Sequence, residues 1–540
     1  MSNNIVRGTM LLTGASFLSR FLGMIYVIPF NALVGSQGGA LYFYAYNPYS
    51  ILISISTVGV PLAVSKFVAK YNSLGDYETG MRMFRTGLMM MFITGLLAFL
   101  VLFFGAEVLA TFIINDDNLG NSVEDVKMVM RMVSFALLLV PAMSIVRGFF
   151  QGHQSMGPTA VSQVIEQIVR IAFVLGGAFL VLKIFDGTIA TAVGYATFAA
   201  FVGAVASCFV LWIYWRKRKK YIHEKMKNQQ YTYELSNKDL IIELFSSAGP
   251  FVIVGIAIPL YQLVDQFTFN RAMVAIGEGK IAELALAAIN LYGHKLVIIP
   301  VTIATGLSIA TLPTLTKSFT QQNNELLKNQ INQSLQIILV LVIPAVVGLV
   351  SLSHEAYGTI YGLEDLSFTG SLLAWYAPVA LLFALFTVSA AILQGINEQR
   401  FAVISLGIGF LIKLLFNIIF IHVFGAKGSI FVTSLAVGTA VGLNLWRIKQ
   451  SIYFSYRQIF KKFLLIVILS GIMYITIFLV KSLIGLIIPY EESRFYMSIM
   501  LIIGVVVGGV VYLWLAYQST LLEKVLGSRV KVLDRFIRRF

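Results

Sequence analysis

The chain has 540 residues, of which 58% are hydrophobic and 44 are glycine. This share excludes an ordinary soluble enzyme, because soluble domains are roughly 45–50% apolar when glycine is included. Lys and Arg exceed Asp and Glu by 40 to 25, a net charge of +15, and the single cysteine, Cys208, excludes an internal disulfide or a cysteine-rich metal cluster.

Apolar runs broken by charged or turn-forming residues predict about fourteen transmembrane helices, each near the length of about 20 residues that a bilayer requires. They cover residues 9–34, 41–65, 86–104, 129–150, 161–182, 189–215, 246–275, 284–312, 331–352, 369–393, 401–423, 429–446, 463–488 and 496–517. The predicted fold class is therefore an all-α polytopic membrane protein. We interpret the first run as a retained helix and not a signal peptide, because it is long and carries Arg20.

Two groups of six predicted helices look like copies of one unit. The fourth span ends at Gln151-Gly152 and the tenth at Gln394-Gly395, an offset of 243 residues. The second and eighth spans end in similar segments, Pro61–Phe67 and Pro313–Phe319, an offset of 252. Because six is an even number, both copies enter the membrane in the same direction and form a parallel repeat.

The distribution of Lys and Arg predicts the orientation. The loops on one side hold 28 of these residues and the loops on the other side hold 5, so both termini are expected in the cytoplasm. The run Arg216–Lys220 directly follows a span, which is typical of an anchor for anionic lipid headgroups and not of a nucleic-acid site. The predicted domains are an N-terminal six-helix lobe (1–215), a basic cytoplasmic linker (216–245), a C-terminal six-helix lobe (246–446), two additional transmembrane helices (463–517) and a basic amphipathic cytoplasmic tail (518–540).

Charged residues inside the predicted spans indicate the cargo. The basic ones are Arg20, Arg131, Arg170, Arg271, Lys295, Lys413 and Lys481, and the acidic ones are Glu166 and Asp265. A cavity with this excess of positive charge attracts anions, and arginine suits phosphoryl groups. We therefore predict an amphipathic cargo with a phosphorylated headgroup. The deepest cations, Arg20, Lys295 and Lys413, are the predicted substrate-binding residues.

The other charges in the spans have simpler interpretations. Arg131, Arg271 and Lys481 lie nearer the outer ends, where long side chains reach the interface. Glu166 and Arg170 are four residues apart, so an ion pair within one helix explains both as well as a functional role does. No catalytic or metal-binding residues are predicted.

Asp265 has three alternative interpretations. It could neutralise Lys413, pair with Arg271, or bind a coupling cation together with Asn417. No cofactor is expected beyond such a cation, and the membrane potential is the alternative driving force.

Two smaller features have packing interpretations. His294 adjoins Lys295 and is expected to pack or to form a hydrogen bond. The tyrosines at positions 42, 44, 46 and 49 are expected to form an aromatic belt at the outer interface, with sugar stacking as the alternative.

Several segments resemble one known group of transporters. They are Gly14–Gly23, Arg147–Gly152, Tyr292–Pro300 and Leu312–Phe319. They are similar to the multidrug/oligosaccharidyl-lipid/polysaccharide exporter superfamily, and within it to the MurJ-type lipid II flippases of the Gram-positive branch and to the related polysaccharide and sporulation transporters. The resemblance extends across essentially all the predicted spans.

The resemblance implies a flippase of the bacterial plasma membrane that carries an undecaprenyl-diphosphate-linked peptidoglycan precursor from the inner to the outer leaflet, and no enzyme. It places essential cavity cations at Arg20 and Lys295, whereas two further family arginines fall near Tyr26 and Leu52. It also implies that the last two spans form a groove for the lipid tail. Anionic membrane lipids and cell-wall synthesis proteins are the expected partners.

Three alternatives remain from the sequence. One is a flippase for another undecaprenyl-linked oligosaccharide, of capsule, teichoic acid or spore envelope. A drug/cation antiporter would carry an acidic cavity, which is opposite to the charge found here. A scaffold for cell-wall enzymes would tolerate loss of the deep charges.

Overall fold

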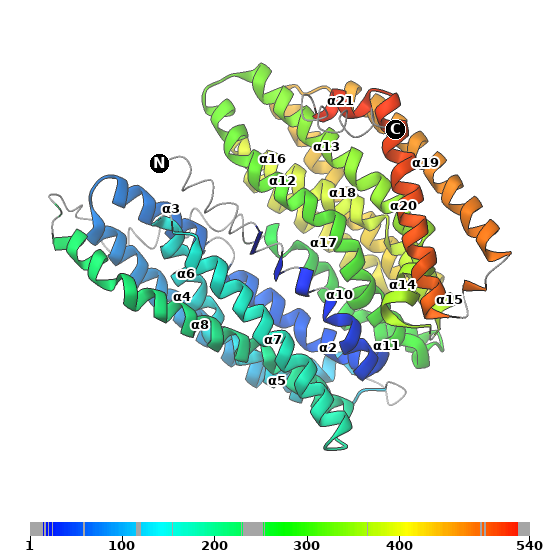
Figure 1. The fold of residues 1–540 in the computed structure, drawn as a ribbon, viewed down its shortest axis with the longest axis horizontal. Coiled ribbons are helices and arrows are strands. Elements are labelled where there is room, and N and C mark those ends of the chain that lie inside the picture. Colours follow the sequence, from blue (N-terminus) through cyan, green and yellow to red (C-terminus); the bar gives the residue numbers. More distant parts are fainter. Residues whose placement is uncertain are drawn as a thin grey trace. The chain divides into compact units, whose positions relative to one another are not determined.

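In the computed structural model, the regular elements of the described residues are all helices (Figure 1). The structure describes residues 14–15, 18–19, 21–23, 25–57, 60–114, 120–153, 155–227, 229, 252, 254–363, 365–486, 489–490 and 493–526. Arg20, most of the predicted linker 216–245 and most of the predicted tail 518–540 lie outside these ranges. The chain divides into two compact units, Met1–Val274 and Ala275–Phe540.

The first unit consists of long apolar helices. Their bounds are α2 (Val27–Thr57), α3 (Val60–Ser73), α4 (Tyr77–Ile113), α5 (Val123–Ser134), α6 (Ala136–Gly152), α7 (Gly157–Lys183), α8 (Ile189–Lys227) and α10 (Ala257–Ala275). Gly35 interrupts α2 with φ of +64° and ψ of −167°, a conformation open to glycine because it has no Cβ. This break lies between the predicted spans 9–34 and 41–65, as the sequence indicates.

The second unit runs from green to red in Figure 1. Its elements are α11 (Gly279–Ala287), η1 (Ala288–Gly293), α12 (His294–Thr320), α13 (Asn324–Ser351), α14 (Ser353–Tyr361), α15 (Leu366–Tyr376), α16 (Val379–Gly395), α17 (Gln399–Phe424), α18 (Ala426–Ile452), α19 (Arg457–Gly485), α20 (Arg494–Gln518) and α21 (Leu521–Leu526). The π-helical turn η1 packs Gly293 so closely against the Ala288 carbonyl that a side chain at Gly293 would collide with it.

Twelve helices among the described residues are long and apolar enough to cross a bilayer. One of them, Phe21–Ile55, contains the break at Gly35 and so combines the first two predicted spans. The predicted seventh span, 246–275, is described only in part and corresponds to α10. The helices therefore fit the predicted polytopic architecture of about fourteen spans.

The division between the units falls inside α10, whereas the predicted linker is 216–245. Hydrogen bonds to α2 explain why most of α10 belongs to the first unit. The Gln266 side chain donates to the Tyr44 carbonyl at 2.8 Å and accepts from Asn47 at 2.9 Å, and Asn270 donates to the Tyr44 hydroxyl at 2.7 Å. The hydropathy of α10 could not predict these buried polar contacts with α2.

The proposed repeat has the same close contact in each unit. In the first unit, a Cβ on Gly152 of α6 would lie 2.8 Å from the Ser65 carbonyl oxygen of α3. In the second unit, a Cβ on Gly395 of α16 would lie 2.9 Å from Leu315 Cβ of α12. In each unit, the glycine that ends α6 or α16 therefore allows this helix to approach the segment that begins at Pro61 or Pro313.

The helix surfaces carry large exposed apolar side chains. Phe104, Leu415 and Phe495 are exposed by 69%, 65% and 69%. Such surfaces are unfavourable in water and suit contact with lipid chains. The described chain is therefore a multi-pass membrane protein.

Candidate functional site

Lys413 is fully buried between α17 and α18. Its ammonium donates to the Ser429 carbonyl at 3.0 Å, to the Ser429 hydroxyl at 3.4 Å and to the Thr433 hydroxyl at 2.8 Å. These three oxygen acceptors compensate the buried positive charge, which would be unfavourable away from water without hydrogen-bond partners. In this conformation the ammonium holds two helices together, and the substrate-binding role of Lys413 stays a prediction.

Lys295 differs from Lys413 in having its ammonium unengaged. It is half-buried in the first turn of α12, directly after the π-helical turn, and no described residue pairs with its ammonium. Its neighbour His294 forms a hydrogen bond with the Tyr376 hydroxyl at 3.0 Å, which agrees with the predicted packing role. Single π-helical turns are often found at functional sites, and hydropathy gave no sign of this one.

The structure narrows the alternatives for Asp265. Its side chain is 2% exposed, in the first unit. The guanidinium of Arg271 lies 5.9 Å from the centre of the Phe112 ring, and its pairing with Asp265 stays a prediction. Asn417 is fully buried on α17, in the second unit, so a shared cation site with Asp265 stays a prediction. Arg20 lies outside the described residues.

One of the alternatives for the charged residues is wrong. Glu166 pairs with Arg147 at 2.7 Å and not with Arg170, because Arg147 on α6 faces it and also donates to Ser207 on α8. The ammonium of Lys481 is bound by Glu355 of α14 at 2.6 Å, and its position at the outer interface stays a prediction.

The predicted tyrosine belt is also wrong. Tyr42, Tyr44 and Tyr49 are exposed by 5% or less, so they pack inside the first unit. Tyr42 stacks on Tyr46 with ring centres 5.2 Å apart. The Arg170 guanidinium lies over Tyr46, which the spacing of residues within one helix could not reveal.

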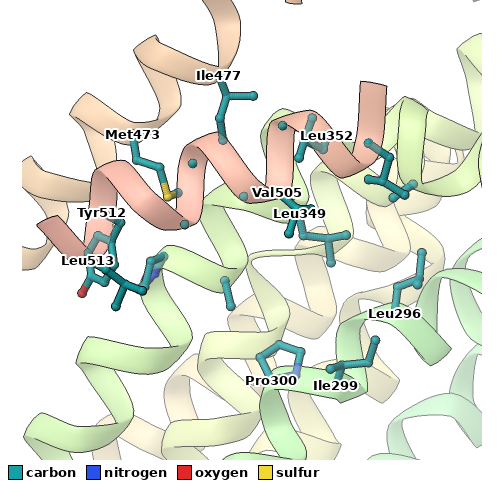
Figure 2. Close-up of a pocket in the computed structure, with 18 residues that line it drawn as sticks. Leu296, Ile299, Pro300, Leu349, Leu352, Met473, Ile477, Val505, Tyr512 and Leu513 are labelled. Carbon is teal, nitrogen blue, oxygen red and sulfur yellow. The ribbon is translucent and has the colours of Figure 1, made fainter. Parts of the chain in front are cut away.

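An apolar groove of about 500 Å³ lies within the second unit (Figure 2). It is bounded by α12, α13, α14 and the last two long helices, α19 and α20. Leu296 and Ile299 approach it from α12, one helical turn or less from Lys295, and Val505 and Leu513 approach from α20. Glycines at 504 and 508 bring α20 close to its neighbours, since a Cβ at these positions would lie 2.6 Å from Leu352 and 2.7 Å from Ile477.

The groove has the chemistry of a site for a hydrocarbon chain. Its lining is almost wholly apolar, and the hydroxyl of Tyr512 is already engaged by the Val340 carbonyl at 2.8 Å. No group of three His, Cys, Asp or Glu among the described residues could hold a metal ion.

Comparison with known proteins identifies the family. A family model described as "Polysaccharide biosynthesis protein" matches residues 5–319, and one described as "MatE" matches residues 250–419. "Lipid II flippase MurJ" of Bacillus subtilis (strain 168) is 49% identical over 533 residues, which is 98% of each chain. The chain belongs to the MurJ family of the MOP superfamily.

A sporulation protein and a solved structure are similar to the chain at lower identity. "Stage V sporulation protein B" of Bacillus subtilis is 25% identical over 455 residues, 82% of this chain and 81% of the relative. A solved structure of "Lipid II flippase MurJ, inward closed conformation" aligns with a TM-score of 0.66 at 18% identity, covering 96% of this chain and 99% of that one. At that identity the structural likeness shows the MurJ fold alone.

Proposed function

We propose that this protein is a lipid II flippase, which moves the undecaprenyl-diphosphate-linked peptidoglycan precursor from the inner to the outer leaflet by alternating access. It is a transporter and not an enzyme. The observation that carries the proposal is the 49% identity, over 98% of each chain, to a protein named for this activity. An apolar groove and an unengaged lysine in the second unit fit a cargo with a hydrocarbon tail and an anionic headgroup.

In this proposal the cargo is bound through its charge and its tail. Arg20 and Lys295 supply cations for the diphosphate, and the groove along α19 and α20 accepts part of the isoprenoid tail. No cofactor takes part. The driving force is either the membrane potential or a coupling cation bound by Asp265 and Asn417, and sodium dependence of transport distinguishes the two.

We further propose that both termini lie in the cytoplasm of a bacterial cell, because Lys and Arg are concentrated in the loops on that side. A fluorescent reporter fused after Phe540 that folds only in the cytoplasm tests this orientation. The basic end of α8 faces anionic headgroups, and Arg216 is fixed there with its guanidinium 4.1 Å from the Trp212 ring centre. Cell-wall synthesis proteins are the proposed protein partners.

The proposal is tested by complementation in cells depleted of their own lipid II flippase. The wild-type protein is expected to restore growth, and Arg20→Ala and Lys295→Ala to insert normally and to fail, with lipid II accumulating in the inner leaflet. Lys317→Ala is a matched control, because Lys317 lies exposed on the same helix as Lys295. Restored growth with both cavity variants would contradict the diphosphate site, and failure of the wild type would contradict the function.

The second candidate is a flippase for another undecaprenyl-linked oligosaccharide. The likeness to a sporulation protein, at 25% identity over 82% of this chain, favours it. The same complementation separates the two, because only a lipid II flippase restores peptidoglycan synthesis.

A further inference from the structure

Arg170 of α7 is a cation inside the first unit without a carboxylate partner among the described residues. The acid on its own helix, Glu166, is bound to Arg147. One Nη–H of Arg170 donates to the Tyr42 hydroxyl at 3.3 Å, and the buried Nε–H has no acceptor among the residues that the structure describes. A guanidinium has five N–H donors, so within this part of the chain most donors of Arg170 have no acceptor.

The surroundings of Arg170 are aromatic. Its Cζ lies 5.5 Å from the centre of the Tyr46 ring, and Tyr46 is stacked on Tyr42. The Tyr26 hydroxyl forms a hydrogen bond with the Tyr42 hydroxyl at 3.1 Å. Tyr26 and Tyr42 are buried, whereas Tyr46 and Arg170 are half-buried, so the cluster is open at these two residues.

Close helix packing fixes the position of Arg170. On α8, a Cβ at Gly203 would lie 2.9 Å from the Glu166 carbonyl oxygen and 3.1 Å from Arg170 Cβ. Glycine therefore lets α8 lie directly behind α7. The base of the Arg170 side chain is supported there, and its guanidinium is directed to α2.

An uncompensated charge in a membrane-spanning helix is energetically unfavourable. The face of Tyr46 and one hydroxyl compensate only part of this. An anion would complete the compensation, and a phosphoryl group matches the two parallel donors of an arginine.

We propose that Arg170, held over the ring of Tyr46, binds a phosphoryl group of the cargo within the first unit. The identity of that cargo rests on the proposed function, whereas the binding site does not. The paired residues Arg147 and Glu166 are excluded from this site, because each already neutralises the other.

The test measures binding of undecaprenyl diphosphate to the full-length protein in detergent by isothermal titration calorimetry, with inorganic pyrophosphate as competitor. Arg170→Gln is expected to weaken binding about tenfold or more, because charge-assisted hydrogen bonds are lost. Arg170→Lys keeps the charge without the planar fork and is expected to be intermediate. Tyr42→Phe keeps the ring and frees one donor of Arg170, so binding is retained.

Arg131→Gln is the matched control. Arg131 is another arginine of a membrane-spanning helix that lies over an aromatic ring, 5.2 Å from Phe103, and its Nε–H is bound to the Phe103 carbonyl at 3.3 Å. Its loss is expected to change binding less than about twofold. If pyrophosphate competes, the protein recognises the phosphates of undecaprenyl diphosphate. If pyrophosphate does not compete, binding is due to the lipid chain or to adventitious contact, and the proposed site is contradicted.

Other outcomes distinguish this inference from the proposed function. Wild-type affinity in Arg170→Gln overturns the site even if complementation succeeds. Arginine-dependent binding together with failed complementation supports the site and moves the function to another diphosphate-linked cargo. If Arg170→Gln does not fold, Arg170→Lys and Tyr42→Phe test the proposed site instead. An equal loss of binding in these two variants would mean that Arg170 and the tyrosines around it have a purely structural role.

Discussion

Individual residues of this protein stabilise charge inside the membrane in three ways. Arg147 and Lys481 each have a carboxylate partner, at 2.7 and 2.6 Å. Lys413 uses a carbonyl and two hydroxyls from α18. Lys295 and Arg170 have no carboxylate partner among the described residues, and these two are the cations to which we assign cargo.

The Lys413 contacts predict a structural effect. Lys413→Ala removes three hydrogen bonds and leaves a cavity between α17 and α18, which is expected to lower the free energy of unfolding by about 2–4 kcal/mol. Thermal unfolding in detergent measures this as a lower melting temperature. Lys449→Ala, at an exposed position on α18, is expected to melt as the wild type does.

The opposite result would support the predicted substrate-binding role of Lys413. If Lys413→Ala melts as the wild type and yet loses transport, the lysine serves the cargo in another conformation.

At the scale of elements, glycine determines how closely helices pack. Gly152 and Gly395 occupy equivalent ends of α6 and α16, and each faces a neighbouring helix at a distance that admits no side chain. The two contacts recur because the repeated sequence segments form the same helix pair in each unit. The repeat is thus a packing repeat as well as a sequence repeat.

Gly152→Ala and Gly395→Ala are each expected to reduce the free energy of unfolding by about 1–3 kcal/mol, because an extra methyl in a close-packed contact forces the backbones apart. Melting temperature of the purified protein is the measurement. Gly105→Ala and Gly438→Ala are matched controls, one in each unit, because a Cβ at either position meets only open space. Equal effects in all four variants would mean that close packing at Gly152 and Gly395 does not explain the loss.

At the scale of the whole molecule, the last two long helices form one wall of the apolar groove. α19 and α20 contribute Met473, Ile477 and Leu513 to its lining. Their outer faces, including Leu479 and Val510, are exposed by 54% and 62% and suit lipid contact. In the proposed function, one face of the pair therefore contacts the tail of the cargo and the other contacts the bilayer.

Gly509→Leu is expected to fill the groove without disturbing the fold, because a Cβ there meets no atom within 4 Å. Displacing two methylenes of a bound tail weakens binding by about 1.6 kcal/mol, about fifteenfold. The measurement is affinity for undecaprenyl diphosphate, with the melting temperature as a check on folding. Gly471→Leu, exposed on α19 and outside the groove, should bind as the wild type; equal loss in both variants would argue against a tail site.

The sequence by itself determined the membrane architecture and the family. Apolar runs are local, and the bilayer imposes a fixed length on each, so the predicted helices agree with the structure closely, including the break at Gly35. The motifs around Arg147–Gly152 and Tyr292–Pro300 carried the resemblance that the 49% identity confirms.

Only the tertiary structure decided which charges are compensated. Glu166 is nearer in sequence to Arg170 but is bound by Arg147, and Glu355, which lies outside the predicted spans, neutralises Lys481. Hydropathy and residue spacing describe one helix at a time. An ion pair, a set of oxygen acceptors around an ammonium, or an apolar groove depends instead on which faces of different helices meet. For that reason the sequence gives the sign of the intramembrane charge, and helix packing decides which of those charges remain for a cargo.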